Sequence, residues 1–205
     1  MPSTSKNRST ALVTGASSGI GEALAGLFAA AGHDLVLVAR SADKLKALAT
    51  ALSARHGVKV RVEPADLSKP GAAETLAARL RRARVPVDVL VNNAGVLAQG
   101  RFAAMGAASH QQMIDLNISG LTAMLSAFVP PMVARGTGRV LNVASIASFQ
   151  PVPSLATYAA SKAYVLSLTE SLSEELRGSG VSITALCPGI TATGMLDQAL
   201  DANPQ

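Results

Sequence analysis

Two side chains in the C-terminal half of the sequence are spaced to act on one proton together. Tyr158 and Lys162 are four residues apart, so on a helix they would share one face. A free tyrosine titrates near pH 10, and proton exchange near neutral pH needs its pKa lowered by about three units. An ammonium about 4 Å from the phenolate would stabilise it by on the order of 4 kcal/mol at an effective dielectric of 20. This is about the energy that a pKa shift of three units requires. The pair is therefore a candidate acid–base group, although an isolated pair of this spacing is more often a surface phenol beside a solvated lysine.

A glycine-rich turn near the N-terminus has the composition of an anion-binding loop. It reads Thr14-Gly-Ala-Ser-Ser-Gly-Ile-Gly21 and joins an apolar run to a helical pattern. Glycine permits a tight turn and close approach of the backbone, and the helix that follows offers unpaired N–H groups and the positive end of its dipole. This position between a first strand and a first helix favours a dinucleotide site over a plain turn. The candidate binding residues are Gly15, Ser17, Ser18, Gly19, Ile20 and Gly21.

The same loop contains the pattern Gly-x-Ser-x-Gly around Ser17, which is typical of the nucleophile elbow of α/β-hydrolases. That chemistry needs an acidic residue and then a histidine further along the chain. The only later histidines are His56 and His110, and neither follows the fifth or sixth predicted strand. A serine hydrolase is therefore kept only as a remote alternative.

The end of the second predicted strand indicates which dinucleotide the loop would take. A site for NAD usually carries an acidic residue about 20 positions after the loop, to bind the ribose hydroxyls. Here the sequence reads Val38-Ala-Arg40-Ser41, with a cation and no acid. A hydrogen bond to a charged group contributes roughly 1.5–3 kcal/mol, or one to two decades of preference. Arg40 therefore favours the 2′-phosphate of NADP(H), the alternative being a surface arginine at a strand end.

The elements that must position these residues alternate between short apolar runs and longer amphipathic stretches. Such alternation predicts a parallel sheet covered on both faces, in one doubly wound α/β domain over residues 1–205. Ser41 is a plausible N-cap, and Pro130-Pro131 should kink or distort the longest helix. The predicted strands are 11–14, 34–39, 58–62, 87–91, 139–143 and 181–186, and the helices begin near 20, 41, 71, 107 and 155, the last two ending near 135 and 177.

Three motifs in order give the chain its resemblance to a known family. With the glycine loop, Asn92-Asn-Ala-Gly95 and Tyr158-Ala-Ala-Ser-Lys162 each at the expected place, the sequence resembles the short-chain dehydrogenase/reductase family over nearly its whole length. The resemblance implies a Rossmann-type sheet of strand order 3-2-1-4-5-6. It also implies hydride transfer between NADP(H) and the carbonyl or secondary alcohol of a small molecule.

The resemblance assigns a role to each catalytic candidate. Tyr158 corresponds to the general acid in carbonyl reduction and the base in alcohol oxidation, and Lys162 to the lysine that also holds the nicotinamide ribose. Ser145, thirteen residues before Tyr158, corresponds to the serine that polarises the substrate carbonyl, with Ser148 as a nearby decoy. Asn117 corresponds to the helix asparagine that holds a proton-relay water, although alone it would be read as local backbone bonding.

Further cofactor contacts follow from the same resemblance, in the loops after the third, fourth and sixth predicted strands. The residues expected beside the adenine are Asp66 and Leu67. Those expected on the adenosine side are Asn93, Ala94 and Gly95. Those expected beside the nicotinamide are Pro188, Gly189, Ile190 and Thr193. Val96, Leu97, Ile146, Val152 and Leu155 are candidates for an apolar substrate wall.

The sequence departs from the family pattern after Thr193. Members of the family usually continue with helices that cover the substrate and with a seventh strand. We therefore expect residues 190–205 to be a remnant of the substrate loop, the seventh strand to be missing and residues 1–9 to be flexible. A cofactor-binding but non-catalytic protein or an inactive fragment is the alternative function. A homodimer or homotetramer would form through the two long helices, near 107–135 and 155–177.

Composition excludes several other classes of protein. Hydrophobic residues make up 49% of the 205 residues and aromatic residues 3%, so the chain is not disordered and has little with which to stack bases. With one cysteine, Cys187, and three scattered histidines, no metal site is expected. The basic cluster Arg79–Arg84 is interpreted as a solvated helix end rather than a nucleic-acid patch. No signal peptide or 18-residue apolar run is present, so we expect a cytoplasmic protein that does not enter a membrane.

Overall fold

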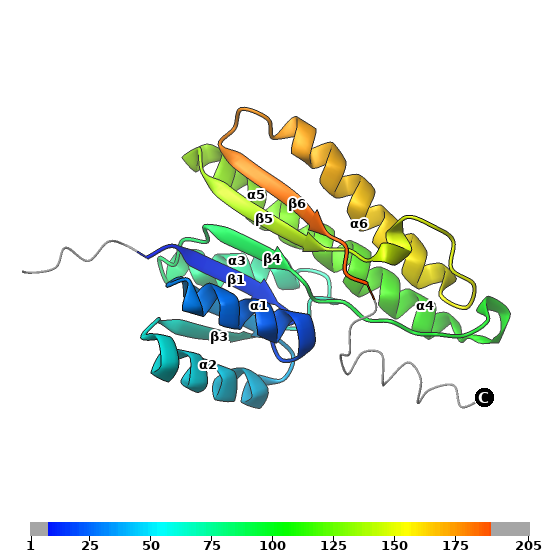
Figure 1. The fold of residues 1–205 in the computed structure, drawn as a ribbon, viewed down its shortest axis with the longest axis horizontal. Coiled ribbons are helices and arrows are strands. Elements are labelled where there is room, and N and C mark those ends of the chain that lie inside the picture. The colour runs from blue at the N-terminus through cyan, green and yellow to red at the C-terminus, as the bar shows by residue number, and fades with distance from the viewer. Residues whose placement is uncertain (1–7, 190–205) are drawn as a thin grey trace, which may run out of the picture.

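A single parallel sheet organises the residues that the structure describes. The computed structural model describes residues 8–189. Six strands pair in the order β3-β2-β1-β4-β5-β6, every pair being parallel (Figure 1). This confirms the predicted doubly wound fold and strand order, in which the chain reverses direction across the sheet between β1 and β4. The strands are β1 (Thr10–Thr14), β2 (Asp34–Ala39), β3 (Val60–Pro64), β4 (Val89–Asn92), β5 (Gly138–Val143) and β6 (Val181–Leu186).

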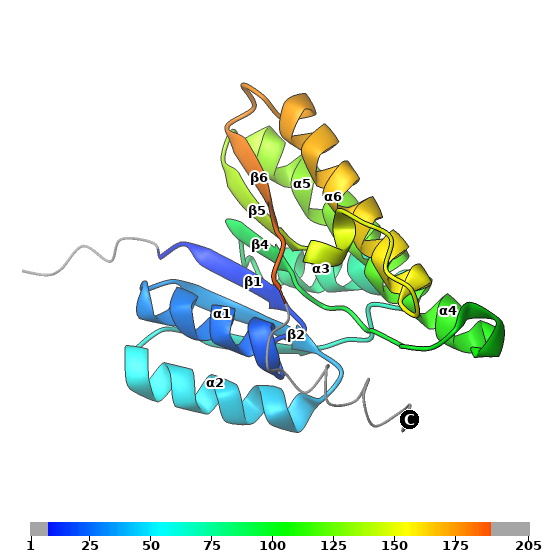
Figure 2. The ribbon, with the colours of Figure 1, turned by 45° about the vertical axis from the view of Figure 1, so that its right-hand side comes forward.

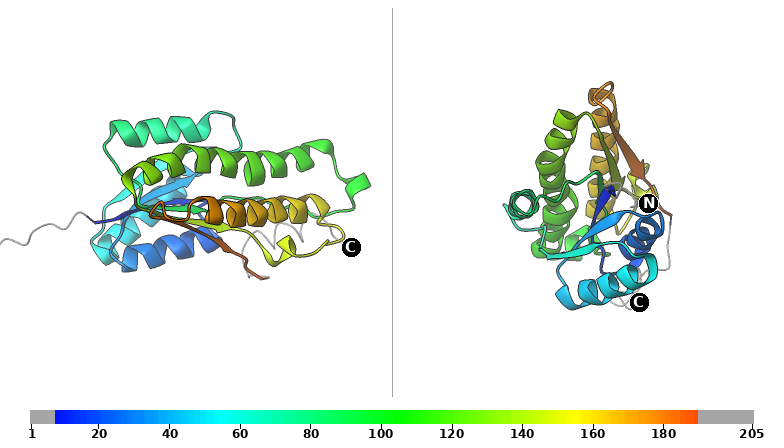
Figure 3. Two further views of the ribbon diagram at one scale, coloured as in Figure 1. Left: turned by 90° about the horizontal axis from the view of Figure 1, so that it is seen from above. Right: turned by 90° about the vertical axis from the view of Figure 1, so that its left-hand side faces the viewer.

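Helices cover both faces of this sheet. Two of them, α1 and α2, lie on one face, and α3, α5 and α6 lie on the other (Figures 2 and 3). Ser41 occupies the N-cap position of α2, as predicted, although its side chain makes no capping hydrogen bond. The helices are α1 (Gly19–Ala30), α2 (Ala42–His56), α3 (Ala72–Arg82), α4 (Ala107–Ile114), α5 (Leu121–Arg135) and α6 (Ala156–Glu175).

The strands are apolar along their length because both of their faces are buried. In β1, Ala11 and Val13 pack into the core beneath α1 and α2, whereas Leu12 points into the core beneath α3, α5 and α6. Side chains in a strand alternate between the two faces, so a buried parallel strand has no polar side to show. This burial on both faces explains why the strands appear in the sequence as continuous apolar runs.

Two strands begin later than the sequence pattern predicts. β3 starts at Val60 rather than residue 58, and β4 starts at Val89 rather than residue 87. Val58 and Val87 are nevertheless buried, with 4% and 5% of their surfaces exposed. Their apolar character serves core packing ahead of the first paired residue, so hydrophobicity alone places the strand start two residues too early.

The long helical region at 107–135 is interrupted, but not where the prolines are. Between α4 and α5 the backbone forms a π-helical segment, η2 (Asp115–Gly120). The α-helix α5 then continues through Pro130 and Pro131, although neither proline can donate a backbone hydrogen bond. The helical region is therefore interrupted, but the interruption lies at Asp115–Gly120, ahead of the two prolines that were predicted to cause it.

The same stretch, 107–135, is the one helix within residues 8–189 that is long and apolar enough to cross a membrane by length and composition. In the structure it lies along the sheet. Leu121, Met124 and Leu125 are buried in the core that α3 and α6 also cover. Its apolar composition is therefore accounted for by packing.

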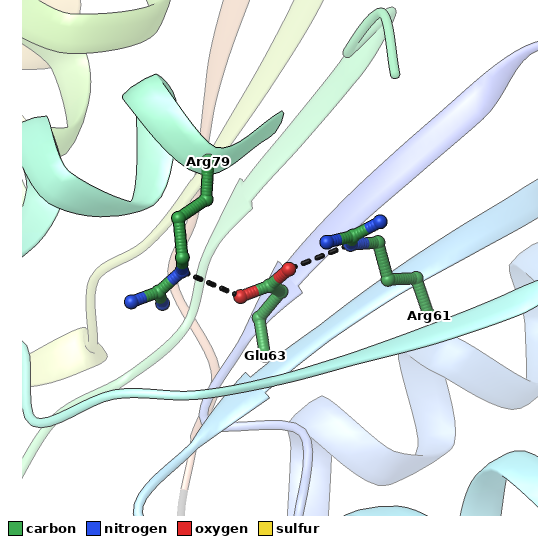
Figure 4. A network of polar contacts seen from close by, with 3 residues as sticks. All are labelled: Arg61, Glu63 and Arg79. Carbon is green, nitrogen blue, oxygen red and sulfur yellow. Dashed lines mark hydrogen bonds and ion pairs between the residues drawn. The ribbon is translucent and has the colours of Figure 1, made fainter. Parts of the chain in front are cut away.

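The outer strand β3 carries a buried charge. Glu63 is 5% exposed, and its two carboxylate oxygens accept hydrogen bonds from Arg61 Nε at 2.6 Å and Arg79 Nε at 2.9 Å (Figure 4). Arg79 comes from the last turn of α3, so the network ties that helix to the edge of the sheet. A buried charge of this kind is stable only when it is paired, as it is here.

Candidate active site

A cleft of about 700 Å³ opens at the carboxyl ends of the strands, where the chain order reverses between β1 and β4. Ligands of open α/β sheets bind at this edge. Of the predicted catalytic and cofactor-binding residues within 8–189, all but Gly21 and Asn117 line the cleft; Ile190 and Thr193 lie outside the described residues. The lining includes Gly15, Ser17, Ser18, Gly19, Ile20, Arg40, Asp66, Leu67, Asn93, Ala94, Gly95, Ser145, Tyr158, Lys162, Pro188 and Gly189.

The glycine loop is folded so tightly that side chains would not fit inside it. Gly15 has φ +64°, in the left-handed region that favours glycine. A Cβ on Gly21 would lie 2.3 Å from the carbonyl oxygen of Gly15 and 2.4 Å from Asn93 Nδ2. Gly21 is therefore needed for packing within the loop and need not line the cleft to serve it.

Thr14 and Asn93 clamp this loop to the end of β4. The Thr14 hydroxyl donates to the carbonyl of Val91 at 3.1 Å and accepts from the backbone N–H groups of Asn93 and Ala94 at 2.9 and 3.0 Å. Asn93 Nδ2 donates to the carbonyls of Thr14 and Gly15 at 2.9 and 3.3 Å. The structure thus gives Asn93 a loop-holding role that the sequence reasoning missed, alongside its place in the cleft wall.

The N-terminus of α1 faces the same cleft. Ser18 is the N-cap residue, yet its side chain does not cap the helix. Because the first N–H groups of a helix lack partners within it, and the dipole makes this end positive, the loop presents donors to an anion.

Positive charge collects at one end of the cleft. Arg40 and Lys44 both line it, four residues apart at the start of α2. Hydrogen bonds from Ser68 chiefly hold the pKa of Asp66 below its ordinary value, burial opposing them, and Arg40 and Lys69 lower it further. Lys44 was missed by the sequence reasoning; the signal that could have found it is its place in the first turn of the helix that follows Arg40.

Tyr158, Ser145 and Lys162 meet at the other end of the cleft. Tyr158 is 9% exposed, and burial raises the pKa of its phenol while the hydrogen bond with Ser145 lowers it. Lys162 Nζ lies 5.8 Å from the centroid of the Tyr158 ring and donates to the carbonyl of Val143 at 2.8 Å. The expected partners are therefore brought together, with Ser145 directly beside the phenol.

The expected electrostatics are wrong in this structure. Lys162 is not among the groups that shift the pKa of Tyr158, and that pKa moves up rather than down. Burial lowers the pKa of Lys162 itself to about 8, opposed only by Cys187. The pKa of Tyr158 rises because burial of the phenol disfavours its charged form, while Lys162 Nζ lies 5.8 Å from the ring centroid and donates to the Val143 carbonyl.

Asn117 lies behind the cleft and joins three segments. Its Oδ1 accepts from the backbone N–H of Val96 at 2.9 Å, and its Nδ2 donates to the Val96 carbonyl at 2.9 Å and to Ser161 Oγ at 3.1 Å. It is 1% exposed and belongs to the π-helical segment. The local backbone bonding considered for an isolated helix asparagine is not what it does, because its partners lie far away in sequence.

The decoy serine has a structural role. Ser148 Oγ donates to the backbone carbonyl of Lys162 at 2.9 Å, which ties the 3-10 segment η3 (Ile146–Ser148) to α6. Ser145 Oγ instead accepts from the backbone N–H of Ala147 and remains in the cleft wall. Ser145 therefore lines the cleft, whereas Ser148 does not.

The apolar wall is only partly as predicted. Val96 and Leu97 line the cleft. Val152 and Leu155 pack with Tyr158 in a small apolar cluster that also contains Met113 and Met105, which the sequence reasoning did not select. Ile146 is 46% exposed and does not line the cleft.

The metal and hydrolase interpretations find no support within residues 8–189. No group of three His, Cys, Asp or Glu side chains there could hold a metal ion. None of the residues lining the cleft is a histidine, so Ser17 has no neighbouring base in this part of the chain.

The cleft fits a nicotinamide dinucleotide on its own geometry. Gly15, Ser17 and Gly19 line the cleft beside a helix N-terminus that has no side-chain cap. Two cations stand at one end, and a phenol, a hydroxyl and an amine stand at the other. The first end suits phosphate and ribose, and the second suits proton exchange beside a hydride carrier.

Comparison with known proteins agrees with this geometry. A sequence model of the short chain dehydrogenase family matches residues 9–204. The chain is 37% identical over 197 residues to oxidoreductase UcpA of Salmonella typhimurium, a match that spans 95% of this chain and 74% of that protein.

Solved structures extend the comparison. A short-chain dehydrogenase from Sphingobium yanoikuyae in complex with NADPH is 40% identical with a TM-score of 0.88, over 96% of this chain and 78% of that one. A bulky-bulky ketone specific alcohol dehydrogenase from Comamonas testosteroni is 35% identical with a TM-score of 0.85, over 91% and 74%. The chain therefore belongs to the short-chain dehydrogenase/reductase family, whose members are NAD(P)-dependent oxidoreductases acting on CH–OH or C=O groups.

Proposed function

We propose that this protein transfers hydride between NADP(H) and the carbonyl or secondary alcohol of a small apolar molecule. The observation that carries the proposal is the meeting of Tyr158 and Ser145 at one end of a cleft whose other end holds Arg40 and the glycine loop. We treat residues 1–205 as one catalytic domain in this proposal.

The preference for NADP(H) over NAD(H) rests on Arg40 and Lys44. Both side chains line the same end of the cleft. The carboxylate at this end that could accept hydrogen bonds from ribose hydroxyls is that of Asp66, and it already accepts a hydrogen bond from Ser68. A guanidinium and an ammonium together suit a phosphate monoester. The Sphingobium relative, crystallised with NADPH, supports this choice.

Proton transfer is assigned to this chain's own residues. When bound, the dinucleotide supplies the hydride to the substrate carbon in reduction and accepts it in oxidation. The Ser145 hydroxyl donates a hydrogen bond to the substrate oxygen, and the Tyr158 hydroxyl gives its proton to that oxygen, leaving a phenolate. In oxidation the phenolate takes the proton back from the alcohol. A phenol with a raised pKa is protonated at neutral pH, as reduction requires.

Lys162 and Asn117 support this proton transfer from behind. The ammonium of Lys162 can donate to ribose hydroxyls while one of its hydrogen bonds goes to the Val143 carbonyl. Asn117 holds the segment around Val96 against α6, which fixes the distance between the substrate loop and the catalytic helix. In this arrangement it can also hold a water that returns a proton to the lysine.

The substrate class follows from the wall near Tyr158. Val96 and Leu97, with the neighbouring cluster of Met113, Val152 and Leu155, favour an apolar ketone, aldehyde or alcohol. The Comamonas relative, described as specific for bulky ketones, supports a substrate of this kind. We further propose a cytoplasmic homodimer or homotetramer formed through α5 and α6, with no nucleic-acid or membrane partner.

Parallel calorimetric titration with NADPH and NADH tests the proposal, followed by turnover of a panel of apolar ketones and aldehydes. We expect tighter binding of NADPH and reduction of at least one panel member. Tighter binding of NADH would overturn the assignment of Arg40. Binding of NADPH with no turnover of any carbonyl or alcohol would instead favour a non-catalytic binding protein.

A further inference from the structure

The helix that carries Tyr158 begins without a side-chain cap. α6 starts at Ala156, and its N-cap residue, Leu155, has an apolar side chain that makes no capping hydrogen bond. A cap from a serine, threonine or aspartate side chain would hold the first turn through its backbone N–H groups. Tyr158 lies in that first turn, so other contacts must hold its place.

One such contact comes from α4, which lies beside the start of α6 (Figures 1 and 2). His110 of α4 and Thr157 of α6 form a hydrogen bond of 2.8 Å between Nδ1 and Oγ1. Thr157 directly precedes Tyr158 in the sequence, so the contact lies one residue from the assigned proton donor. It joins positions 47 residues apart and therefore ties the first turn of α6 to a different helix, which a local cap would not do.

The His110 ring is itself held by its neighbours. The ring of Phe102 lies against it, with 4.4 Å between the two centroids and 32° between the two planes. The Nε2 atom of His110 is buried and has no hydrogen-bond partner among residues 8–189, so in that part of the chain the imidazole bonds through Nδ1. A ring packed on one face and bonded at one nitrogen has a fixed orientation, and it can therefore hold the Thr157 hydroxyl in a fixed place.

A second contact holds the segment that leads into α6. The backbone N–H of Gly100 donates to the carbonyl of Ser154 at 2.9 Å. Ser154 has φ +64°, in the left-handed region that residues with side chains rarely adopt. Such a conformation persists only where the surrounding contacts determine it. The start of α6 is therefore held at Ser154 by the loop after β4 and at Thr157 by α4.

Apolar packing around Tyr158 does a different job from these polar contacts. The ring packs with Met113, Val152 and Leu155, which keeps it out of water. Burial of apolar surface has no preferred direction, whereas a hydrogen bond depends on distance and angle. The cluster therefore keeps the phenol ring buried, and the bond between His110 and Thr157 fixes the turn from which the ring projects.

We propose that His110 is a positioning residue for the proton transfer assigned to Tyr158, an inference that rests on the function proposed above. Through Thr157 it fixes the first turn of α6, so that the phenol hydroxyl lies beside Ser145 and the substrate oxygen. A displacement of about 1 Å at a reacting group can lower a rate by about 10²-fold, so a contact one residue away is close enough to matter. His110 does not line the cleft, and in this role it touches neither substrate nor cofactor.

Four variants separate the hydrogen bond from the packing around it. Thr157→Val keeps the branched shape and removes the hydroxyl, whereas Thr157→Ser keeps the hydroxyl. His110→Leu removes both ring nitrogens, whereas His110→Asn keeps a polar atom near the place of Nδ1. With a carbonyl substrate and NADPH, we expect kcat to fall about tenfold in Thr157→Val and His110→Leu and to stay within about threefold of the parent in the two conservative variants. KM and the Kd of NADPH should stay within about twofold in all four.

Ser171→Ala is the matched control, because it removes a hydroxyl from the same helix away from the cleft, where that group donates to the Ser167 carbonyl at 2.9 Å. It should leave kcat unchanged. A lower melting temperature with unchanged kcat in Thr157→Val and His110→Leu would overturn the proposal, because the contact would then serve stability alone. A raised KM with unchanged kcat would overturn it in favour of direct contact with substrate.

A measurement without substrate keeps this test separate from that of the proposed function. The chain has two tyrosines and no tryptophan, so in a Tyr164→Phe background the ultraviolet emission reports Tyr158 alone. Because the Tyr158 side chain is buried, we expect acrylamide to quench this emission about twofold more steeply when Thr157→Val is added, and no more steeply when Thr157→Ser is added. Unchanged quenching in Thr157→Val would refute the positioning role. Failure of the parent to turn over any carbonyl would overturn the proposed function instead, and the quenching result would still decide whether His110 and Thr157 hold Tyr158.

Discussion

Lys162 Nζ donates a hydrogen bond of 2.8 Å to the carbonyl of Val143, so the catalytic helix α6 is joined to the end of β5 inside the protein. The lysine is buried, and this position lowers its pKa from the ordinary 10.5 to about 8. The fold therefore holds, at the centre of its site, an ammonium group whose charged form is disfavoured by burial. Such an arrangement exchanges stability for function.

The first prediction concerns stability. Between about pH 8 and 10.5 the unfolded chain binds a proton at Lys162 that the folded chain has lost, so the parent should gain stability as pH rises through this window. Lys162→Met removes the charge, and at pH 7 it should stabilise the fold by up to about 3 kcal/mol, less the lost bond to Val143. Urea unfolding of both proteins from pH 7 to 10.5 measures this. A Lys162→Met variant that is less stable than the parent at pH 7 would contradict the assigned cause.

The second prediction concerns Tyr158. Tyr158→Phe removes one oxygen and keeps the ring in its apolar cluster. Turnover should fall by about 10²–10⁴-fold, while NADPH binding changes little because the proton donor alone is lost. Steady-state rates and calorimetry on one preparation measure the two effects. Tyr164→Phe is the matched control, since Tyr164 does not line the cleft and its hydroxyl hydrogen-bonds with Thr122; retention of full activity in Tyr158→Phe would refute the mechanism.

The third prediction concerns the choice of cofactor. Arg40→Ala should weaken NADPH binding about tenfold and leave NADH binding within about twofold, because in the proposed binding mode the guanidinium would contact the 2′-phosphate and no other part of the dinucleotide. Lys44→Ala should weaken NADPH binding in the same direction. Lys46→Ala, on the same helix but absent from the cleft wall, should change neither. Equal loss of both cofactors in Arg40→Ala would assign that residue to another part of the dinucleotide.

The fourth prediction compares two glycines of one helix. Gly21→Ala would press a methyl group against Gly15 and Asn93, so it should destabilise the fold by roughly 1–3 kcal/mol and prevent cofactor binding. Nothing lies within 4 Å of a Cβ at Gly26, so Gly26→Ala should stabilise the helix by roughly 0.5–1 kcal/mol. Thermal melting with and without NADPH distinguishes them. Similar behaviour of the two variants would show that the loop is less tightly packed than described.

Motifs that follow strand ends could be placed from the sequence with little error. The glycine loop, Arg40, Asn93 and Ser145 each follow an apolar run, and a parallel sheet brings the ends of its strands to one edge. The place of the cleft was predictable for that reason, whereas the strand order and most of the lining residues were predicted from the resemblance to the family. Boundaries at Val58 and Val87 were not, because burial and backbone pairing begin at different residues.

Features that depend on contacts between distant segments could not be predicted in the same way. The clamp from Asn93 to the glycine loop, and the direction of the pKa shift at Tyr158, each arise from the three-dimensional packing around the side chain. Lys44 differs, because its place in the first turn of the helix that follows Arg40 was visible and simply went unused. Asn117 was selected by resemblance, but its link to Val96 and Ser161 required the structure.

The π-helical segment has a consequence for the phase of the long helix that contains it. Each residue of an α-helix advances the side-chain direction by about 100°, so one additional residue in a turn rotates everything beyond it by that angle. Met113 before the segment can therefore face the cluster around Tyr158, while Met124 and Leu125 after it face the sheet. Asn117 stands where the two registers meet. If residues 115–120 formed ordinary α-helix instead, Met124 and Leu125 would be turned by about 100° from their places in the core, and the two buried faces of the helix could no longer be satisfied together.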